Sequence, residues 1–302
     1  MKQLISFLFI VVLLVACGSG KDENHKLTQQ EKLRQDSLYR AALKVGVMPT
    51  TDCLPLFVAK ECGMFDSVGV DVRLKMFRAQ MDCDTALAGS SVEGSVSDLV
   101  RVARLQKQGV KVQPSVALNT YWQIVANRLS RVKQIAQLSD KMIAITRNSA
   151  TDLVAQAAID SAKPKYDVYK IQINDVKVRL NMLINNELDA AMLTEPQATE
   201  ARAHDNPVLY DTRGKDLRLG VLAFRQDKMS KNGRQKQYDN MVKAYNEAVD
   251  SINSKGVAHY ADVLKKYCGC NEMTIQRLPK LHYEHAAKPR LKDLEWVAKM
   301  NK

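Results

Sequence analysis

A complete strand–helix–strand unit lies between residues 43 and 77, which read LKVGVMPTTDCLPLFVAKECGMFDSVGVDVRLKMF. Its first segment, Leu43–Met48, is a short apolar run with β-branched residues and predicts a buried strand followed by a loop. The apolar stretch Leu54–Cys62 predicts a helix, because Gly63 stands where a helix C-cap glycine belongs. Apolar residues then alternate along Val70–Phe77, which predicts a second strand.

The same alternation of strands and helices continues to about residue 225. Apolar runs predict further strands near residues 92–96, 110–118, 122–126, 141–146, 166–171, 188–193, 208–209 and 217–224. Helical periodicity separates these runs and continues in a C-terminal tail from Lys236. Repeated strand–helix–strand units predict an α/β fold in which helices cover both faces of parallel sheets.

The predicted elements fall into two halves. Residues 43–118 form lobe 1, which residues 217–302 complete by returning to it, and residues 122–215 form lobe 2. The chain crosses between the lobes near Asn119–Gln123 and Lys215–Leu219, so we expect the hinge there. Ligands of such sheets bind beyond the carboxyl ends of the strands.

The amino terminus has the pattern of an export signal. Met1-Lys2 precedes the apolar run Leu4–Ala16, which is too short to span a bilayer as a helix. The run ends in Leu14-Val-Ala-Cys-Gly18, which resembles a bacterial lipobox. We therefore expect a signal peptide over residues 1–16, acyl chains such as palmitate on Cys17, and a polar tether over residues 17–42. This predicts a membrane-anchored lipoprotein of the bacterial cell envelope, on the periplasmic face or exposed at the surface.

Composition narrows the class of protein further. The 302 residues suggest about two domains, and 46% hydrophobic with 26% charged residues is typical of a globular protein. The net charge is +12, and residues 213–302 hold 19 basic against 10 acidic residues. We interpret this excess as a solvated basic face and expect no nucleic-acid partner, because only 6% of residues are aromatic.

The sequence does not decide which cysteines form disulfides and which stay free thiols or contact a ligand or metal. Removal of Cys17 as the lipid attachment site leaves five cysteines, so at least one thiol is unpaired in a monomer. Cys53 and Cys83 follow predicted strands of one lobe and could form a disulfide, stay buried thiols or touch a ligand. The tight pair Cys268-Gly-Cys270 could be a disulfide, a soft-metal clip or a helix end.

Four blocks of sequence carry a family resemblance. They are residues 43–72 with Pro55-Leu-Phe-Val-Ala-Lys-Glu-Cys-Gly-Met-Phe65, residues 85–98 with Thr85-Ala-Leu-Ala-Gly-Ser-Ser-Val-Glu-Gly94, residues 135–149, and Leu183-Ile-Asn-Asn-Glu-Leu-Asp-Ala-Ala-Met-Leu-Thr-Glu-Pro196. In this order they resemble the NMT1/THI5-like substrate-binding proteins of ABC importers for nitrate, sulfonates, taurine and thiamine pyrimidines. Asn186 departs from the glycine usual in that family.

The resemblance implies a type II periplasmic-binding-protein fold, with two α/β lobes, a hinge and a helical C-terminal tail. It also implies an ABC permease and an ATPase as partners, and a small-molecule ligand held between the lobes of a monomer. The resemblance also implies no enzymatic activity. The sequence agrees with this, because no nucleophile–base arrangement, phosphate loop or dinucleotide fingerprint is present in it. We therefore expect no catalytic residue, no cofactor and no resident metal.

Residues near the predicted strand ends, polar except for Ala150, are the candidate ligand contacts: Thr50, Thr51, Asp52, Arg78, Ser90, Ser91, Asp98, Asn119, Ser149, Ala150, Thr151 and Glu195. Ser149–Thr151 begin a helix, whose free N–H groups could bind an anion or simply be capped. Asp98 and Glu195 could contact ligand, cap helices or form ion pairs between the lobes.

The mixture of acids with one nearby guanidinium predicts a small polar organic ligand rather than a plain anion. An amino-substituted heterocycle or a zwitterion would fit, with its amino group at Glu195 or Asp98 and its acceptor end at the Ser149–Thr151 amides. The main alternative is a surface lipoprotein that uses the same fold for adhesion or for soft-metal capture by Cys53, Cys83, Met48 and Met81. An enzyme built on this fold is a third hypothesis, which the lipobox disfavours.

Overall fold

The structure is a computed structural model that describes residues 28–231 and 233–300. Contacts divide the chain between Ala41 and Ala42, and the two parts are described separately. In the first part, helix α1 (Gln29–Ala41) has no buried residue. It begins with a capping box, in which Thr28 N donates to the Glu31 carboxylate (2.7 Å) and Glu31 N donates to Thr28 Oγ1 (3.3 Å). The sequence pattern predicts no helix in this part of the tether.

The predicted signal peptide, Cys17 and the first part of the tether lie outside the described residues. Within the residues that are described, no helix is both long enough and apolar enough to cross a membrane.

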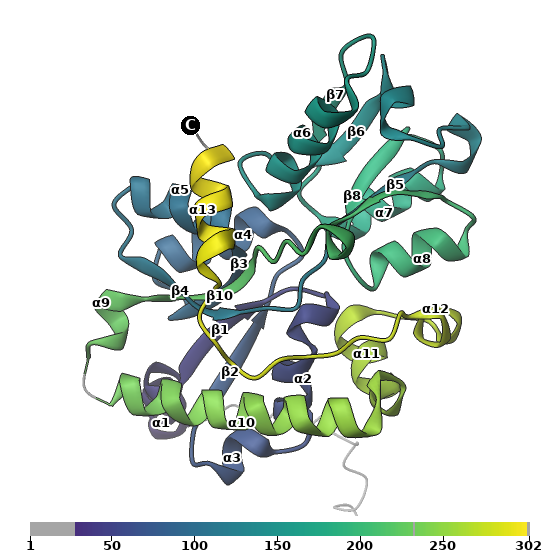
Figure 1. The fold of residues 1–302 in the computed structure, drawn as a ribbon. Helices are drawn as coiled ribbons and strands as arrows, with labels where there is room; N and C mark the ends of the chain where they lie inside the picture. Colours follow the sequence, from purple (N-terminus) through teal and green to yellow (C-terminus); the bar gives the residue numbers. More distant parts are fainter. Residues whose placement is uncertain (1–27, 232, 301–302) are drawn as a thin grey trace, which may run out of the picture. The chain divides into compact units, whose positions relative to one another are not determined.

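The first of two five-stranded sheets holds the beginning and the end of the α/β region. Its strands are β1 (Leu43–Val47), β2 (Val72–Met76), β3 (Gly94–Asp98), β4 (Val112–Ala117) and β10 (Gly220–Arg225), in the order β2-β1-β3-β10-β4. β1 is parallel to β2 and β3, whereas β10 is antiparallel to β3 and β4. We call this sheet and its connecting segments lobe 1 (Figure 1).

The second sheet repeats the same arrangement with strands between residues 123 and 211, and it is the sheet of lobe 2. Its strands are β5 (Gln123–Ala126), β6 (Met142–Ile145), β7 (Tyr169–Gln172), β8 (Ala190–Leu193) and β9 (Val208–Asp211), in the order β7-β6-β8-β5-β9. β6 is parallel to β7 and β8, and β5 is antiparallel to β8 and β9. In both sheets, therefore, the strand next to last in the order runs against its neighbours.

The prediction of parallel sheets is wrong for these two strands. β5 and β10 are the strands that the chain forms directly after crossing from one sheet to the other. Each enters its sheet without a preceding crossover helix, so the rule that makes strand–helix–strand units parallel does not apply to it.

Helices connect the strands at most of the predicted places. They are α2 (Leu54–Glu61), α3 (Met64–Ser67), α4 (Gln80–Ala88) and α5 (Leu99–Lys107) in lobe 1, α6 (Ala150–Ala162), α7 (Val176–Ile184) and α8 (Gln197–Ala203) in lobe 2, and α9 (Gln226–Met229), α10 (Arg234–Lys255), α11 (Ala261–Cys268), α12 (Glu272–Arg277) and α13 (Leu291–Met300) after β10. Short 3₁₀ turns occupy Thr51–Cys53, Arg128–Ser130, Ile135–Leu138, Thr212–Lys215 and Val257–Tyr260. Between β5 and β6 the chain therefore forms only 3₁₀ turns and no α-helix.

Two apolar clusters form the core, and each runs from one lobe into the other. The first includes Phe57 of α2 and Leu183 of α7, together with the buried stripe of α10. The second includes Leu105 of α5 and Val154 of α6. Because burial of each large apolar side chain contributes about 1.5–3 kcal/mol, both clusters favour contact between the lobes.

The C-terminal tail returns along lobe 1. Between α12 and α13, residues 278–290 form an extended segment, which we call the strap (Figure 1). Tyr283 in the strap exchanges hydrogen bonds with Asn253 of α10, and its hydroxyl donates to Thr51 O (2.7 Å). The strap therefore holds the loop that follows β1.

Candidate ligand-binding site

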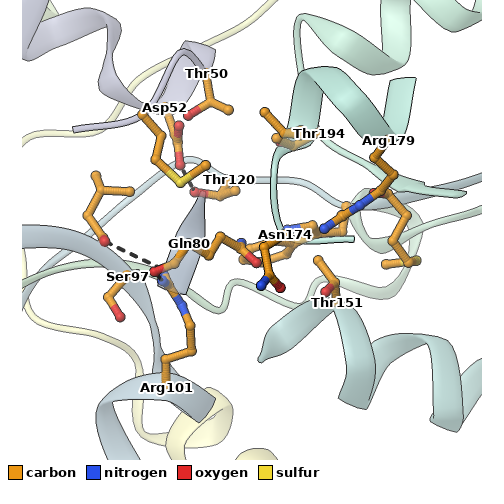
Figure 2. Close-up of a pocket in the computed structure, with 15 residues that line it drawn as sticks. Thr50, Asp52, Gln80, Ser97, Arg101, Thr120, Thr151, Asn174, Arg179 and Thr194 are labelled. Atoms are coloured by element: carbon orange, nitrogen blue, oxygen red, sulfur yellow. Dashed lines mark hydrogen bonds between the residues drawn. The ribbon is translucent and has the colours of Figure 1, made fainter. Parts of the chain in front are cut away.

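A cavity lies between the two lobes at the carboxyl ends of several strands (Figure 2). Lobe 1 and the first crossover supply Met48, Thr50, Asp52, Gln80, Val96, Ser97, Arg101, Thr120 and Trp122, and lobe 2 supplies Thr151, Asn174, Val176, Arg179, Met192 and Thr194. In this conformation the cavity has a volume of about 30 Å³, which is room for about two water molecules.

Asp52 is the acidic side chain of the lobe 1 wall. It follows β1 in a 3₁₀ turn and is 6% exposed. Its Oδ2 accepts a hydrogen bond from Thr120 Oγ1 (2.6 Å), and its buried Oδ1 has no partner among the described residues. Gly220 of β10 makes this pair possible, because a Cβ at that position would collide with Thr120 Oγ1.

Two more buried polar atoms of the same wall lack partners within the described chain. They are Oε1 of Gln80, which begins α4, and Oγ of Ser97, near the end of β3. Buried polar atoms are nearly always hydrogen-bonded, so unpaired atoms around one cavity indicate a place for a ligand or water.

Arg101 reaches the cavity from α5 as a neutralised cation. Its Nε donates to Asp98 (2.9 Å), and its Nη1 donates to Asp84 (3.0 Å) and to Gln80 O (2.7 Å). Burial opposes its charge, but Asp84 and Asp98 raise the pKa of Arg101 above its ordinary value. This guanidinium therefore fixes the wall and holds the backbone of Gln80.

Arg179 of α7 is the cationic side chain of the lobe 2 wall, and it is 2% exposed. Its guanidinium donates to Ile173 O, to Met192 O (2.7 Å) and to Thr146 Oγ1 (2.7 Å). Within the described chain it has no ion pair with a carboxylate. Burial lowers its pKa to about 10, and Asp175 opposes the shift only in part.

Several direct contacts join the lobes beside the cavity. Thr51 N donates to Glu195 O (2.9 Å), and Gln197 Nε2 donates to Pro49 O (2.8 Å). Arg78 Nε pairs with Asp175 Oδ2 at 2.9 Å. The loops after β1 and β2 of lobe 1 thus touch the start of α8 and of α7 in lobe 2.

The structure brings some of the candidate residues together and separates others. Thr50, Asp52 and Thr151 line the cavity, and Thr51 and Arg78 each contact the other lobe. Ser90 and Ser91 lie before the amino end of β3, opposite the cavity, so the prediction that they contact ligand is not supported by their position. Asn119 is also outside the lining, because its side chain donates to His282 O of the strap.

Glu195 and Asp98 are fully engaged inside their own lobes. Glu195 accepts hydrogen bonds from Gln123 (3.0 Å), from Thr199 N (2.9 Å) and Thr199 Oγ1 (2.6 Å), and from Arg202 (2.9 Å). Asp98 caps α5 through Arg101 N (2.9 Å). Neither lines the cavity, so neither is placed to bind the amino group of a ligand there.

The start of α6 is closed by its own cap. Ser149 Oγ accepts from Thr151 N (3.1 Å) and donates to Thr146 O (2.7 Å). Ser149 and Ala150 are completely buried and do not line the cavity, and only Thr151 does. The capping alternative therefore describes this helix end, and the expected anion site on its amides is not formed.

Arg179 and Asn174 are among the lining residues that the sequence reasoning missed, as is Arg101. One signal for Arg179 is present in the sequence, because it lies on the buried face of α7 with Val176, Leu180 and Leu183. A charged residue on an apolar helix face needs a reason. Asn174 carries no such signal.

All five cysteines in the described residues are free thiols. Burial raises the pKa of Cys53, with Asp52 adding to the effect, and raises the pKa of Cys83 to about 11. Both therefore stay protonated, and neither lines the cavity. In the described part of the chain, no group of three or more His, Cys, Asp or Glu could hold a metal ion.

Two mixed α/β sheets with a polar cavity between them define the fold of the periplasmic binding proteins, and solved structures bear this out. The zinc-bound ligand binding component of an ABC-type import system from Staphylococcus aureus is 14% identical, with 86% of this chain and 90% of that chain covered and a TM-score of 0.72. The nitrate-binding protein NrtA from Synechocystis PCC 6803 is 16% identical, with 86% and 80% covered and a TM-score of 0.75.

The alkanesulfonate-binding protein SsuA from Xanthomonas axonopodis pv. citri, bound to MOPS, is 14% identical, with 86% and 90% covered and a TM-score of 0.71. At these identities the likeness establishes the fold. The family model described as NMT1/THI5 like matches residues 50–252, so the chain belongs to this family. A comparison with curated protein sequences gives no match.

Proposed function

We propose that this chain is the solute-binding component of an ABC importer and captures a small polar organic ligand between its two lobes. The observation that carries the proposal is the cavity between the lobes, with the unpaired Asp52 Oδ1 on one wall and Arg179 on the other. The family and the fold support it. The partners would be an ABC permease and its ATPase, and the protein would act as a monomer without a catalytic step.

The same proposal includes export and anchoring. Residues 1–16 would be removed as a signal peptide, lipid on Cys17 would attach the protein to a membrane of the bacterial envelope, and residues 17–42 would be the tether. Lobe 1 (residues 43–118, completed by 217–302) and lobe 2 (residues 122–215) would move about the crossovers at 119–123 and 215–219 and close on the ligand.

Two measurements test ligand capture. The protein is purified from its native envelope without refolding, and native mass spectrometry is expected to reveal a bound small molecule. After its removal by partial unfolding and refolding, adding the identified molecule back should compact the protein in small-angle scattering. A preparation that carries no small molecule and never becomes more compact with extracts of its growth medium would contradict the proposal.

Anchoring is tested separately. Cys17→Ala should abolish labelling with a palmitate analogue and move the protein from the membrane fraction, or leave it unprocessed. Cys62→Ala is the matched control, because Cys62 is an exposed free thiol in the folded part of the chain. Labelling that survives in Cys17→Ala would contradict the lipid anchor.

A further inference from the structure

The two walls of the cavity carry opposite uncompensated charges. On lobe 1, Arg101 is paired with Asp84 and Asp98, and Arg104 is also paired with Asp84. These four charges cancel and leave Asp52 as the charge that this wall turns toward the cavity. On lobe 2, Asp175 is paired with Arg78, which leaves the charge of Arg179 without an ion pair in the described residues. The cavity is therefore negative on one side and positive on the other.

The unpaired atoms on lobe 1 require hydrogen-bond donors. Asp52 Oδ1 and Gln80 Oε1 are both buried acceptors without partners in the described chain, and a carboxylate oxygen or an amide oxygen cannot donate. A buried acceptor without a donor costs free energy, and a charged one costs more. A ligand group rich in N–H donors, such as an ammonium, satisfies both atoms.

The lobe 2 wall requires a ligand group that accepts hydrogen bonds and carries negative charge. Arg179 is held by two backbone carbonyls and one hydroxyl, all of which accept its hydrogens without neutralising its charge. Figure 2 shows Arg179, Thr151 and Thr194 on the side of the cavity opposite Asp52, with Gln80 and Asn174 between them. An anionic or strongly accepting ligand group on this side would compensate the guanidinium and could accept from Asn174 or Thr194 as well.

We infer, on the basis of the proposed function, that the ligand is amphoteric: its donor-rich cationic end faces Asp52 and Gln80 on lobe 1, and its anionic end faces Arg179 on lobe 2. A simple anion would lie against the unpaired carboxylate of Asp52, and a simple cation would lie against Arg179. Each would leave one buried charge uncompensated and would repel a like charge in a site of low dielectric constant. The ligand thus bridges the two lobes by charge, which couples its binding to their closure.

Three matched probes test the inference: β-alanine, which has both ends, propionate, which lacks the amine, and propylamine, which lacks the carboxylate. Nitrate serves as a fourth probe of the purely anionic class. Calorimetry on the full chain should show β-alanine binding the wild type at least tenfold more tightly than any of the other three. The inference is overturned if nitrate or propionate binds as tightly as β-alanine, or if β-alanine does not bind below about 10 mM.

Substitutions in the two walls of the cavity then test the cationic and the anionic end of the ligand separately. Asp52→Asn should shift the ratio of β-alanine to propionate affinity at least tenfold toward propionate, whereas Arg179→Met should shift preference toward propylamine. Arg179→Lys keeps the charge and should keep the wild-type ratio. Damage to the fold would weaken all probes together, so only opposite shifts in selectivity support the inference, and equal losses for all probes contradict it.

The outcome also separates this inference from the proposed function. If an anion alone binds and compacts the protein in small-angle scattering, the function as a solute-binding protein stands and the amphoteric ligand is wrong. If the protein carries no small molecule from its envelope and no solute compacts it, the proposed function itself fails.

Discussion

Lobe 1 and lobe 2 each bury an arginine beside the cavity, and the two are held in opposite ways. Arg101 in α5 is surrounded by the carboxylates of Asp84 and Asp98, so its charge is compensated within its own lobe. Arg179 in α7 is surrounded by carbonyl and hydroxyl oxygens, so its hydrogen bonds are satisfied but its charge is not. The pKa of Arg101 is accordingly raised, and that of Arg179 is lowered to about 10.

The difference teaches how to separate a structural charge from a functional one. A buried ion is tolerated when a partner compensates it, and removing that partner is costly. A buried ion without a partner lowers stability, so its presence beside a cavity points to a ligand that completes it. Burial alone does not distinguish the two arginines, because both side chains are almost completely buried.

The largest expected loss of stability comes from removing a carboxylate that compensates the charge of Arg101. Asp98→Ala removes the cap of α5 and one counter-ion of Arg101. We expect a loss of about 3–5 kcal/mol in the free energy of unfolding, because a buried guanidinium is left with part of its charge unpaired. Unfolding by denaturant at neutral pH measures this loss of stability.

Asp71→Ala is the matched control. Its pair with Arg73 belongs to the same lobe, but the side chains are 47% and 40% exposed. The control should lose no more than about 1 kcal/mol, as exposed pairs do. If Asp98→Ala behaved like the control, Arg101 would not depend on its carboxylates and the comparison would lose its basis.

Alkaline pH should act through Cys83 of lobe 1 and Arg179 of lobe 2 with opposite signs. Cys83 in lobe 1 has its pKa raised from 9.0 to about 11 by burial. Between these values the unfolded chain ionises the thiol and the folded chain does not, so this contribution to stability is lost as pH rises, by about 2–3 kcal/mol in total. Above about pH 10 the folded state releases the Arg179 proton while the unfolded chain keeps it, so this contribution rises with pH.

Unfolding under reducing conditions from about pH 8 to pH 11 separates these contributions. Cys83→Ala should flatten the fall in stability, and only the slope is compared because the substitution also leaves a cavity. Cys62→Ala, at an exposed thiol, should leave the slope as in the wild type. A slope that is the same in all three proteins would contradict the shifted pKa of Cys83.

The sequence predicts the elements of both lobes well but not the directions of β5 and β10. The spacing of apolar residues and the positions of turn residues are local features of the sequence. For this reason residues 43–77 predict β1, α2 and β2 correctly. Strand direction depends on how the chain re-enters a sheet after crossing between lobes. That event has no local signal, so both antiparallel strands were missed.

For the site, position after a strand was a better guide than residue chemistry. Thr50 and Asp52 line the cavity, as expected for a loop that follows the carboxyl end of β1. Glu195 occupies a similar place after β8, but its carboxylate turns back to Thr199 and Arg202. Which way a strand-end side chain turns is set by its hydrogen-bond partners, which for Glu195 lie largely in the helix that follows. Arg179 was missed for a related reason, since it reaches the site from a helix interior.

Substitution of Arg179, whose charge is uncompensated, should lower the free energy of unfolding less than substitution of Asp98, which compensates Arg101. Arg179→Met leaves Met192 O and Ile173 O without a donor, at about 1–3 kcal/mol each, but it also relieves the burial of an unpaired charge. We expect the free energy of unfolding to fall by no more than about 2 kcal/mol. A loss equal to that of Asp98→Ala would show that both arginines are structural.

The smallest effect should come from Arg78, which competes with Arg179 for Asp175. The Arg78 side chain is 66% exposed, so its pair with Asp175 contributes no more than about 1 kcal/mol to stability and is weakened by salt. Asp175 remains in place without it, because its carboxylate also caps α7 through Lys177 N (2.9 Å) and Val178 N (3.1 Å).

Arg78→Ala should therefore leave unfolding nearly unchanged but alter the cavity. The released charge of Asp175 would compensate Arg179 in part, so β-alanine affinity should fall by about twofold to fivefold, and the loss of a contact between the lobes should make the protein less compact in small-angle scattering. Arg73→Ala, at an exposed pair within lobe 1, should change neither quantity. If the two variants behave alike, Asp175 does not act on Arg179, and the charge of lobe 2 is set by α7 and its carbonyl partners alone.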